Sequence, residues 1–263
     1  KLLFQGEERS DVCPKQIYET YLTGNCQREP SKYMEYGLYY ETKCIGNSAY
    51  ENVDDLPRHK RTGERTIVHG RIDEAIERFK GVVKETGLML DSVQVKKSVP
   101  YEDHPYDNVD VCLTGTADII SPFKYRNIDF PMAVIDLKLT KDLDNTYQDK
   151  FTPWFSAPWG DLSKMDKTQA YLYSYLWNLP FMYLVFDYKA EDAGWKPFPV
   201  QTLATHPDSQ EAKTRHLELM RNVRLVLDRI IEWDSSGYRI EPSDACKKCP
   251  VLSCIQKNQI TFA

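Results

Sequence analysis

The chain has 263 residues, of which 41% are hydrophobic, so it is long enough for one large or two small domains with a core that needs no disulfides. Its formal net charge of −5 argues against a protein that coats nucleic acid with a basic surface, while a local basic groove remains compatible with it. No stretch reaches the roughly 18 apolar residues of a membrane helix and the first ten residues do not resemble a signal peptide, so we expect no membrane partner and a cytoplasmic location.

Hydrophobic periodicity predicts an α/β protein with one mixed central sheet flanked by helices. In chain order we expect a Tyr-rich helical region (10–42), a charged loop (51–62), an amphipathic helix (64–85), three strands (91–99, 109–120 and 132–140), a helix (164–178), a strand (181–188) and a long helix (208–232). We divide the chain into an N-terminal helical region (1–62), a core (63–200) and a C-terminal helix with a cysteine tail (201–263), which together form one compact domain.

Two opposite charges interrupt the hydrophobic segment AVIDLKLT at residues 133–140. In a strand, Asp136 and Lys138 point to the same face because side chains alternate with period two. A buried charge without a partner or a metal costs several kcal/mol. The pair is therefore either an ion pair on the solvated face of an edge strand or part of a site with further carboxylates.

A second acidic residue lies in the preceding strand, CLTGTADII, where Asp118 stands among apolar residues. Mg²⁺ takes oxygen ligands from one or two carboxylates and keeps several waters, which leaves room for substrate phosphates. Asp118 and Asp136 fit that demand. Gly115, three residues before Asp118, predicts either a close backbone approach beside the site or a simple bulge.

Three further polar side chains are candidates for the same site. Helical spacing places His69 at least partly inward on the helix at 64–85, as a core histidine or as a ligand. In KTQAYLYSYL, Gln169 and Tyr173 are four residues apart and so share one helix face.

Seven cysteines in a chain without a secretion signal indicate reduced thiols or metal ligands. Three of them lie within nine residues, CKKCPVLSC, at Cys246, Cys249 and Cys254, so that several thiolates can converge on one metal or cluster. The spacing does not decide between zinc and iron–sulfur. Cys112, within a predicted strand, is expected to be a small buried hydrophobic residue.

These motifs resemble the PD-(D/E)XK nuclease superfamily in its RecB-like branch, whose order of motifs is G-x-x-x-H, G-x-x-D, D-x-K and Q-x-x-x-Y. GTAD, DLK and QAYLY match the last three, whereas Gly63 precedes His69 by six residues instead of four. The resemblance implies a restriction-endonuclease-like fold. It also implies these roles for the matched positions: catalytic residues Asp118, Asp136, Lys138, Gln169 and Tyr173, and Mg²⁺ or Mn²⁺ ligands His69, Asp118, Asp136 and the carbonyl of Leu137.

The cysteine tail resembles that of iron–sulfur members of this branch, the AddB-type and CRISPR adaptation nucleases. By this resemblance a [4Fe–4S] cluster is held by Cys26, Cys246, Cys249 and Cys254, with Cys13 and Cys44 as alternative distant ligands and zinc as the alternative metal. Cys249 and Cys254 stand one residue closer than expected. Such a ligand set joins the two ends of the chain, so metal binding contributes to folding.

The resemblance implies a metal-dependent hydrolase of phosphodiester bonds: an exonuclease on single-stranded DNA or DNA ends in a bacterial, archaeal or phage-infected cell. Helicase, recombination or CRISPR adaptation subunits are its expected partners. The alternatives are an inactive nucleic-acid-binding or structural module of a larger nuclease or phage complex, and an RNase. Aromatic residues at Trp154, Phe155 and Trp159 predict either a loop packed on the body or a flap on which bases stack. The basic segment 57–65 is either a phosphate contact or a solvated loop.

Overall fold

The computed structural model describes residues 18, 32–46, 55–56, 58–59, 61–107, 110–146, 158–189 and 194–237. The chain divides into two units. Residues 30–216 form one unit, which holds every strand described below, and residues 1–29 with 217–263 form the other. Helix α5 (Gln210–Ser235) begins in the first unit and ends in the second.

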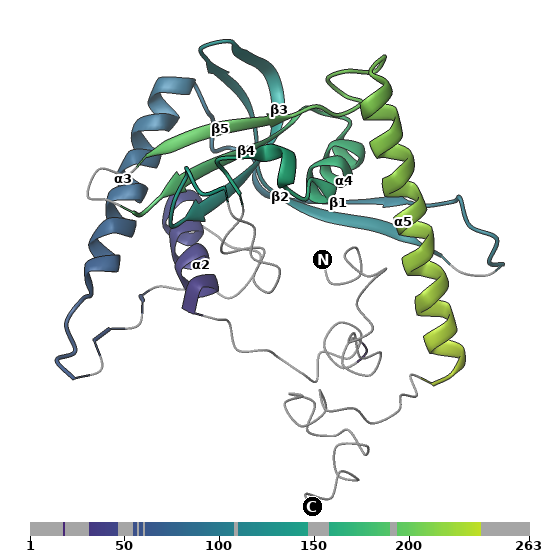
Figure 1. The fold of residues 1–263 in the computed structure, drawn as a ribbon, viewed down its shortest axis with the longest axis horizontal. Coiled ribbons are helices and arrows are strands. Elements are labelled where there is room, and N and C mark those ends of the chain that lie inside the picture. The colour runs from purple at the N-terminus through teal and green to yellow at the C-terminus, as the bar shows by residue number, and fades with distance from the viewer. Residues whose placement is uncertain are drawn as a thin grey trace, which may run out of the picture. The chain divides into compact units, whose positions relative to one another are not determined.

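A five-stranded mixed sheet is the centre of the first unit (Figure 1). Its strands are β1 (Val93–Pro100), β2 (Cys112–Tyr125), β3 (Ile128–Thr140), β4 (Phe181–Asp187) and β5 (Trp195–Val200), and they neighbour each other in sequence order. β3 and β4 are parallel, and the other three pairs are antiparallel. The expected α/β class with a mixed sheet is therefore confirmed.

Helices cover both faces of this sheet. On one face α2 (Lys32–Ile45) and α3 (Ile67–Thr86) pack in one hydrophobic cluster that includes Ile135 and Leu137 of β3. On the other face α4 (Thr168–Trp177), preceded by a short 3-10 helix (Leu162–Lys164), packs on a cluster that includes Val134. α2 and α3 therefore belong to one core, while the predicted boundaries at residues 62 and 200 stay a prediction.

Most predicted elements are present, but the hairpin of β2 and β3 is longer than expected. Both strands extend through SPFKYRNIDFP, a segment whose two prolines argue against strand in the sequence. The register shifts between Ser121 and Phe123, so Pro122 lies at a bulge, where a missing N–H is tolerated. Arg126 adopts a left-handed conformation (φ 53°) in the tight turn that joins the strands.

The prediction also missed β5, whose sequence WKPFPV contains Pro197 and Pro199. Proline cannot donate to a ladder and is confined to edge strands or bulges. β5 is the edge strand beside β4, so both prolines are compatible with strand structure there.

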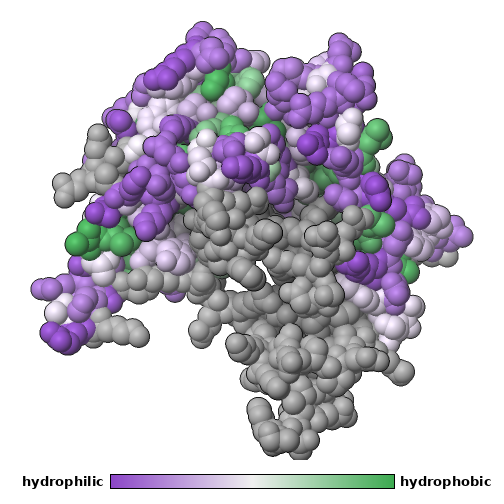
Figure 2. All heavy atoms as spheres, in the orientation of Figure 1, coloured by the Kyte–Doolittle hydropathy of each residue, from purple (hydrophilic) through white to green (hydrophobic). Residues whose placement is uncertain are grey.

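On the face that Figure 2 shows, the described residues are mainly hydrophilic, with small separate hydrophobic patches. Cys112 was expected to be buried and is exposed, because it is the first residue of β2 and precedes the part of the strand that helices cover. In the part of the chain that the structure describes, no helix combines the length and apolarity needed to cross a membrane.

Candidate active site

Asp118 and Asp136 face each other where β2 and β3 stop pairing. The ladder runs from the turn to Ile119 and Ile135, and its register, extended by one residue, sets Asp118 opposite Asp136. Beyond that point the Leu137 N–H donates to Oδ2 of Asp118 (2.8 Å) instead of to a carbonyl of β2. A side-chain carboxylate thus takes the place of a backbone acceptor, and the two strands separate around a pair of acids.

Asp136 is held by two donors. Its side chain is 4% exposed, and its Oδ2 is in contact with the ammonium of Lys138, two residues along the same strand. Its Oδ1 accepts a hydrogen bond from Nε2 of Gln169 in the first turn of α4 (2.6 Å). The start of that helix is fixed by Asp166, whose carboxylate accepts from the Thr168 N–H (2.9 Å). The structure therefore brings Asp136, Lys138 and Gln169 into contact.

Tyr173 reaches the same site from α4 because Gly115 lets the helix come close. A Cβ at position 115 would lie 2.9 Å from Leu176 and 3.0 Å from the Tyr173 ring, closer than real Cβ contacts allow. Burial, and then the charges of Asp136 and Asp118, raise the pKa of Tyr173 to about 12. The expected close approach at Gly115 is confirmed, and its partner is α4.

The structure adds an acid that the sequence did not suggest, Glu41 of α2. Its charge acts on both Asp118 and Lys138. Nε2 of Gln94, on β1, donates to Oε1 of Glu41 (2.7 Å). Gln94 stands beside Asp118 in the β1–β2 register, in a left-handed conformation (φ 50°) that interrupts β1. Glu41 is partly buried and follows the buried Tyr40 in α2. Its place beside a core residue of an amphipathic helix is the one sequence feature that could have indicated this role.

The charged groups of the site shift each other's pKa values. Burial, and then the negative charge of Asp136, raise the pKa of Asp118 well above its usual value. Burial alone would lower the pKa of Lys138, but the charges of Asp136 and Asp118 outweigh it, so this pKa is raised. The site therefore holds a firmly charged ammonium beside an acid that resists ionisation.

Two buried amide oxygens bear on whether the site fits a cation. Oε1 of Gln94 and Oε1 of Gln169 are buried without a hydrogen-bond partner. Together with three carboxylates they form an oxygen-rich donor set of the kind that Mg²⁺ and Mn²⁺ prefer. Within the described ranges, no three His, Cys, Asp or Glu side chains are already arranged to hold a metal ion. The chemistry of the donor set thus fits a hard cation, while Lys138 and Gln94 engage two of the carboxylates.

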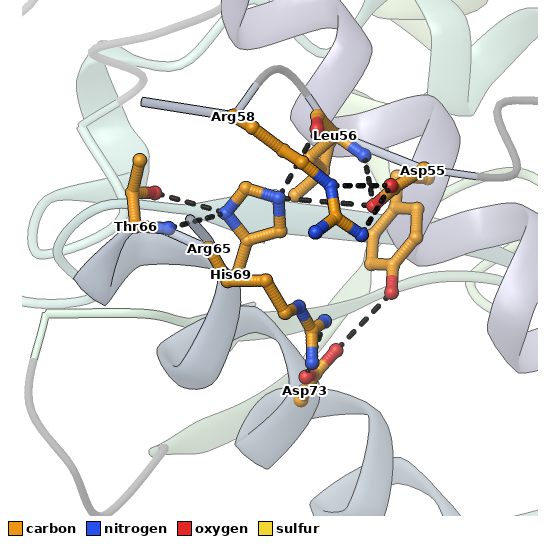
Figure 3. A network of polar contacts seen from close by, with 8 residues as sticks. Asp55, Leu56, Arg58, Arg65, Thr66, His69 and Asp73 are labelled. Atoms are coloured by element: carbon orange, nitrogen blue, oxygen red, sulfur yellow. Dashed lines mark hydrogen bonds and ion pairs between the residues drawn. The ribbon is translucent and has the colours of Figure 1, made fainter. Parts of the chain in front are cut away.

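His69 forms a local network at the start of α3 (Figure 3). It is 1% exposed; its Nδ1 accepts from the Thr66 N–H (3.0 Å), and its Nε2 donates to the Leu56 carbonyl (3.1 Å). Asp55 lies 3.8 Å from Nε2, and Gly63 (φ 69°) forms the turn before the helix. Both ring nitrogens are thus used within the protein, so the structure supports the core-histidine interpretation and leaves no open nitrogen for a metal.

Replacing His69 by glutamine is expected to lower the free energy of unfolding by about 1–3 kcal/mol, because two buried hydrogen bonds are disturbed. Urea denaturation measures this change. The matched control is His59→Gln, at an exposed position in the segment before α3. Mn²⁺ affinity, measured by calorimetry, should stay within a few-fold of the original. A large loss of Mn²⁺ affinity with little change in stability would instead identify His69 as a ligand.

Several predicted residues lie outside the described ones: Cys13, Cys26, Cys246, Cys249, Cys254, Trp154 and Phe155. Trp159 is described and is 5% exposed, packed on Tyr183 and Phe198 at centroid distances of 5.5 and 5.4 Å. It is therefore part of the core and not a surface on which bases stack. Cys44 is buried, and burial raises the pKa of its thiol, which makes it a poor candidate ligand.

Comparison with solved structures finds a similar fold. A crystal structure from Eubacterium rectale, described as a "putative exonuclease", superposes with a TM-score of 0.53 at 16% sequence identity, over 95% of this chain and 82% of that one. At this identity the likeness shows a shared fold. No protein-family model matches the sequence, and no curated protein matches it.

Proposed function

We propose that this protein is a metal-dependent nuclease of the PD-(D/E)XK type that hydrolyses phosphodiester bonds in DNA. The observation that carries the proposal is the pair of facing acids, Asp118 and Asp136, with Lys138 beside them at the point where β2 and β3 separate. The fold shared with a protein described as an exonuclease supports it. DNA ends or single strands are the substrates that the sequence motifs favour.

Each side chain has a role in this proposal. Asp118, Asp136, Glu41 and the Leu137 carbonyl would hold one or two Mg²⁺ or Mn²⁺ ions, which supply charge neutralisation at the phosphate and a more acidic water. Lys138 orients the attacking water and stabilises negative charge on the phosphate, since its raised pKa keeps it an ammonium. Gln169 positions Asp136 through the bond to Oδ1, and Tyr173 contacts the substrate backbone from the same helix face.

We expect Mg²⁺ or Mn²⁺ to support cleavage of labelled single-stranded DNA, and EDTA to stop it. Mn²⁺ should also raise the melting temperature of the protein without substrate, because it binds the folded state. This rise should grow as the pH increases, since Asp118, with its raised pKa, must lose a proton to bind a cation.

The same assay with double-stranded DNA and with RNA separates the alternatives. Cleavage of RNA alone would make the protein an RNase. Binding of nucleic acid without cleavage under any metal would favour an inactive module of a larger complex and would overturn the proposed activity.

We further propose a [4Fe–4S] cluster on Cys26, Cys246, Cys249 and Cys254, with zinc as the alternative metal. The support is the cysteine spacing in the sequence. Helicase, recombination or CRISPR adaptation subunits stay proposed partners on the same sequence resemblance.

A further inference from the structure

A cavity of about 230 Å³ lies between the start of α4 and strands β4 and β5. Its lining combines aromatic and apolar side chains, Leu162, Met165, Tyr171, Tyr183 and Phe198, with polar ones. Pockets for drug-sized ligands are about 300–1,000 Å³, so this cavity suits a smaller group, such as one flat ring system. None of the catalytic roles above uses it.

The cavity adjoins the acids of the site. Tyr183 pairs with Asp136 in the β3–β4 register, and the charge of Asp136 acts on its phenol. Lys167, also in the lining, is two residues before Gln169, which bonds Asp136. A polymeric ligand that places one of its rings in the cavity would therefore pass close to Asp136.

The aromatic wall is firmly supported from behind. Trp159 stacks on Phe198 with the two rings 27° from parallel, and it meets Tyr183 edge-on at 71°. Since Trp159 is itself buried, these two rings are held in place before any ligand arrives. A preformed wall costs little ordering when a flat ring stacks on it.

The cavity lining includes one cationic and one anionic side chain, Lys167 and Glu211. Lys167 has no carboxylate partner among the residues that the structure describes, so its ammonium is available to an anion such as a phosphate. Gln201 and Glu211, both exposed, also line the cavity and offer hydrogen-bond acceptors. Acceptors of this kind suit the amino groups on the edges of adenine and cytosine.

We propose that this cavity binds one unstacked base of the substrate strand, next to the phosphate that is cleaved. The base stacks on the wall of Tyr171, Tyr183 and Phe198, and Lys167 contacts the adjoining phosphate. This inference rests on the proposed nuclease function and adds to it a subsite for a single-stranded end, because a base inside a duplex cannot enter.

Binding of fluorescein-labelled single-stranded DNA, measured by anisotropy with Ca²⁺ in place of Mg²⁺, tests the subsite without cleavage. Tyr171→Leu should weaken binding about 5- to 150-fold, the range expected for the loss of one stacking partner. Tyr171→Phe keeps the ring and should bind normally. Tyr175→Leu is the matched control: it is on the same helix and its ring packs on His216, outside the cavity lining.

Strands with a single abasic site, moved one position at a time, locate the base. At one position the abasic strand should bind the original protein more weakly and should bind Tyr171→Leu no worse than the intact strand does. Equal binding by Tyr171→Leu and Tyr175→Leu, with cleavage intact in the original protein, would overturn the subsite alone. An original protein that neither binds nor cleaves single strands would overturn the proposed function and the subsite together.

Discussion

Replacing Asp118 by asparagine is expected to reduce cleavage by about a thousandfold or more while making the metal-free protein more stable. The activity is lost because an amide is a poor ligand for a hard cation and leaves the phosphate charge less neutralised. The Leu137 N–H keeps an acceptor, since the amide oxygen can occupy the place of Oδ2. Labelled DNA cleavage with Mn²⁺ measures the first effect.

The gain in stability follows from the raised pKa of Asp118. Between its unfolded pKa of about 4 and its higher folded pKa, the native state binds more protons than the unfolded state, so stability falls as pH rises. Asparagine removes this loss, and we expect about 1 kcal/mol more stability at neutral pH and no gain below about pH 4. Urea denaturation at both pH values measures it.

Asp129→Asn is the control for this experiment. Asp129 is on the neighbouring strand β3, but its side chain is 64% exposed and pairs with Lys124 on the surface, so the change should leave both stability and cleavage nearly unaltered. Cleavage by Asp118→Asn within a few-fold of the original would refute the assignment of the active site.

Protein purified without oxygen is expected to be brown and to contain about four irons per chain, and Cys26→Ser should lose this iron and much of the stability. The loss of both follows from a ligand set that joins distant parts of the sequence. Elemental analysis and the visible spectrum measure the metal, and denaturation measures the stability. A colourless protein with zinc would select the alternative metal.

Cys112→Ser is the control here, because Cys112 is exposed at the start of β2 and its loss should change neither iron nor stability. Absence of both iron and zinc from the anaerobic protein would contradict the cluster. A full metal load in Cys26→Ser would move the distant ligand to Cys13 or Cys44.

Local patterns predicted the parts of the fold that depend on near neighbours. The inward stripe of α3 and the hydrophobic face formed by Ile135 and Leu137 follow from one segment at a time, and both are present in the structure. β5 was missed because whether a strand tolerates Pro197 and Pro199 depends on its place at the edge of the sheet. The position of β5 at the edge is decided by the topology of the whole sheet and not by the six residues of the strand.

In the candidate site, too, some features follow from near neighbours in the sequence and others from the whole fold. Asp136 and Lys138 were placed on one face by strand geometry alone, whereas Glu41 meets Gln94 across 53 residues and leaves almost no trace in the sequence. His69 matched a motif position, yet its hydrogen bonds to Thr66 and Leu56 depend on the turn before α3. Residue type and order therefore indicated the chemistry, and packing decided which side chains meet.

The two prolines of β5 also determine how the sheet can meet another chain. Strand addition needs a row of backbone donors along a sheet edge, and Pro197 and Pro199 remove two of them from a strand of six residues. β1 is the opposite edge strand, and all its residues except Pro100 have a backbone N–H. It also exposes Lys96 and Lys97, and lysines on an edge strand discourage pairing with other strands. A protein that extended this sheet would have to do so along β1 and bring acidic side chains to meet those lysines.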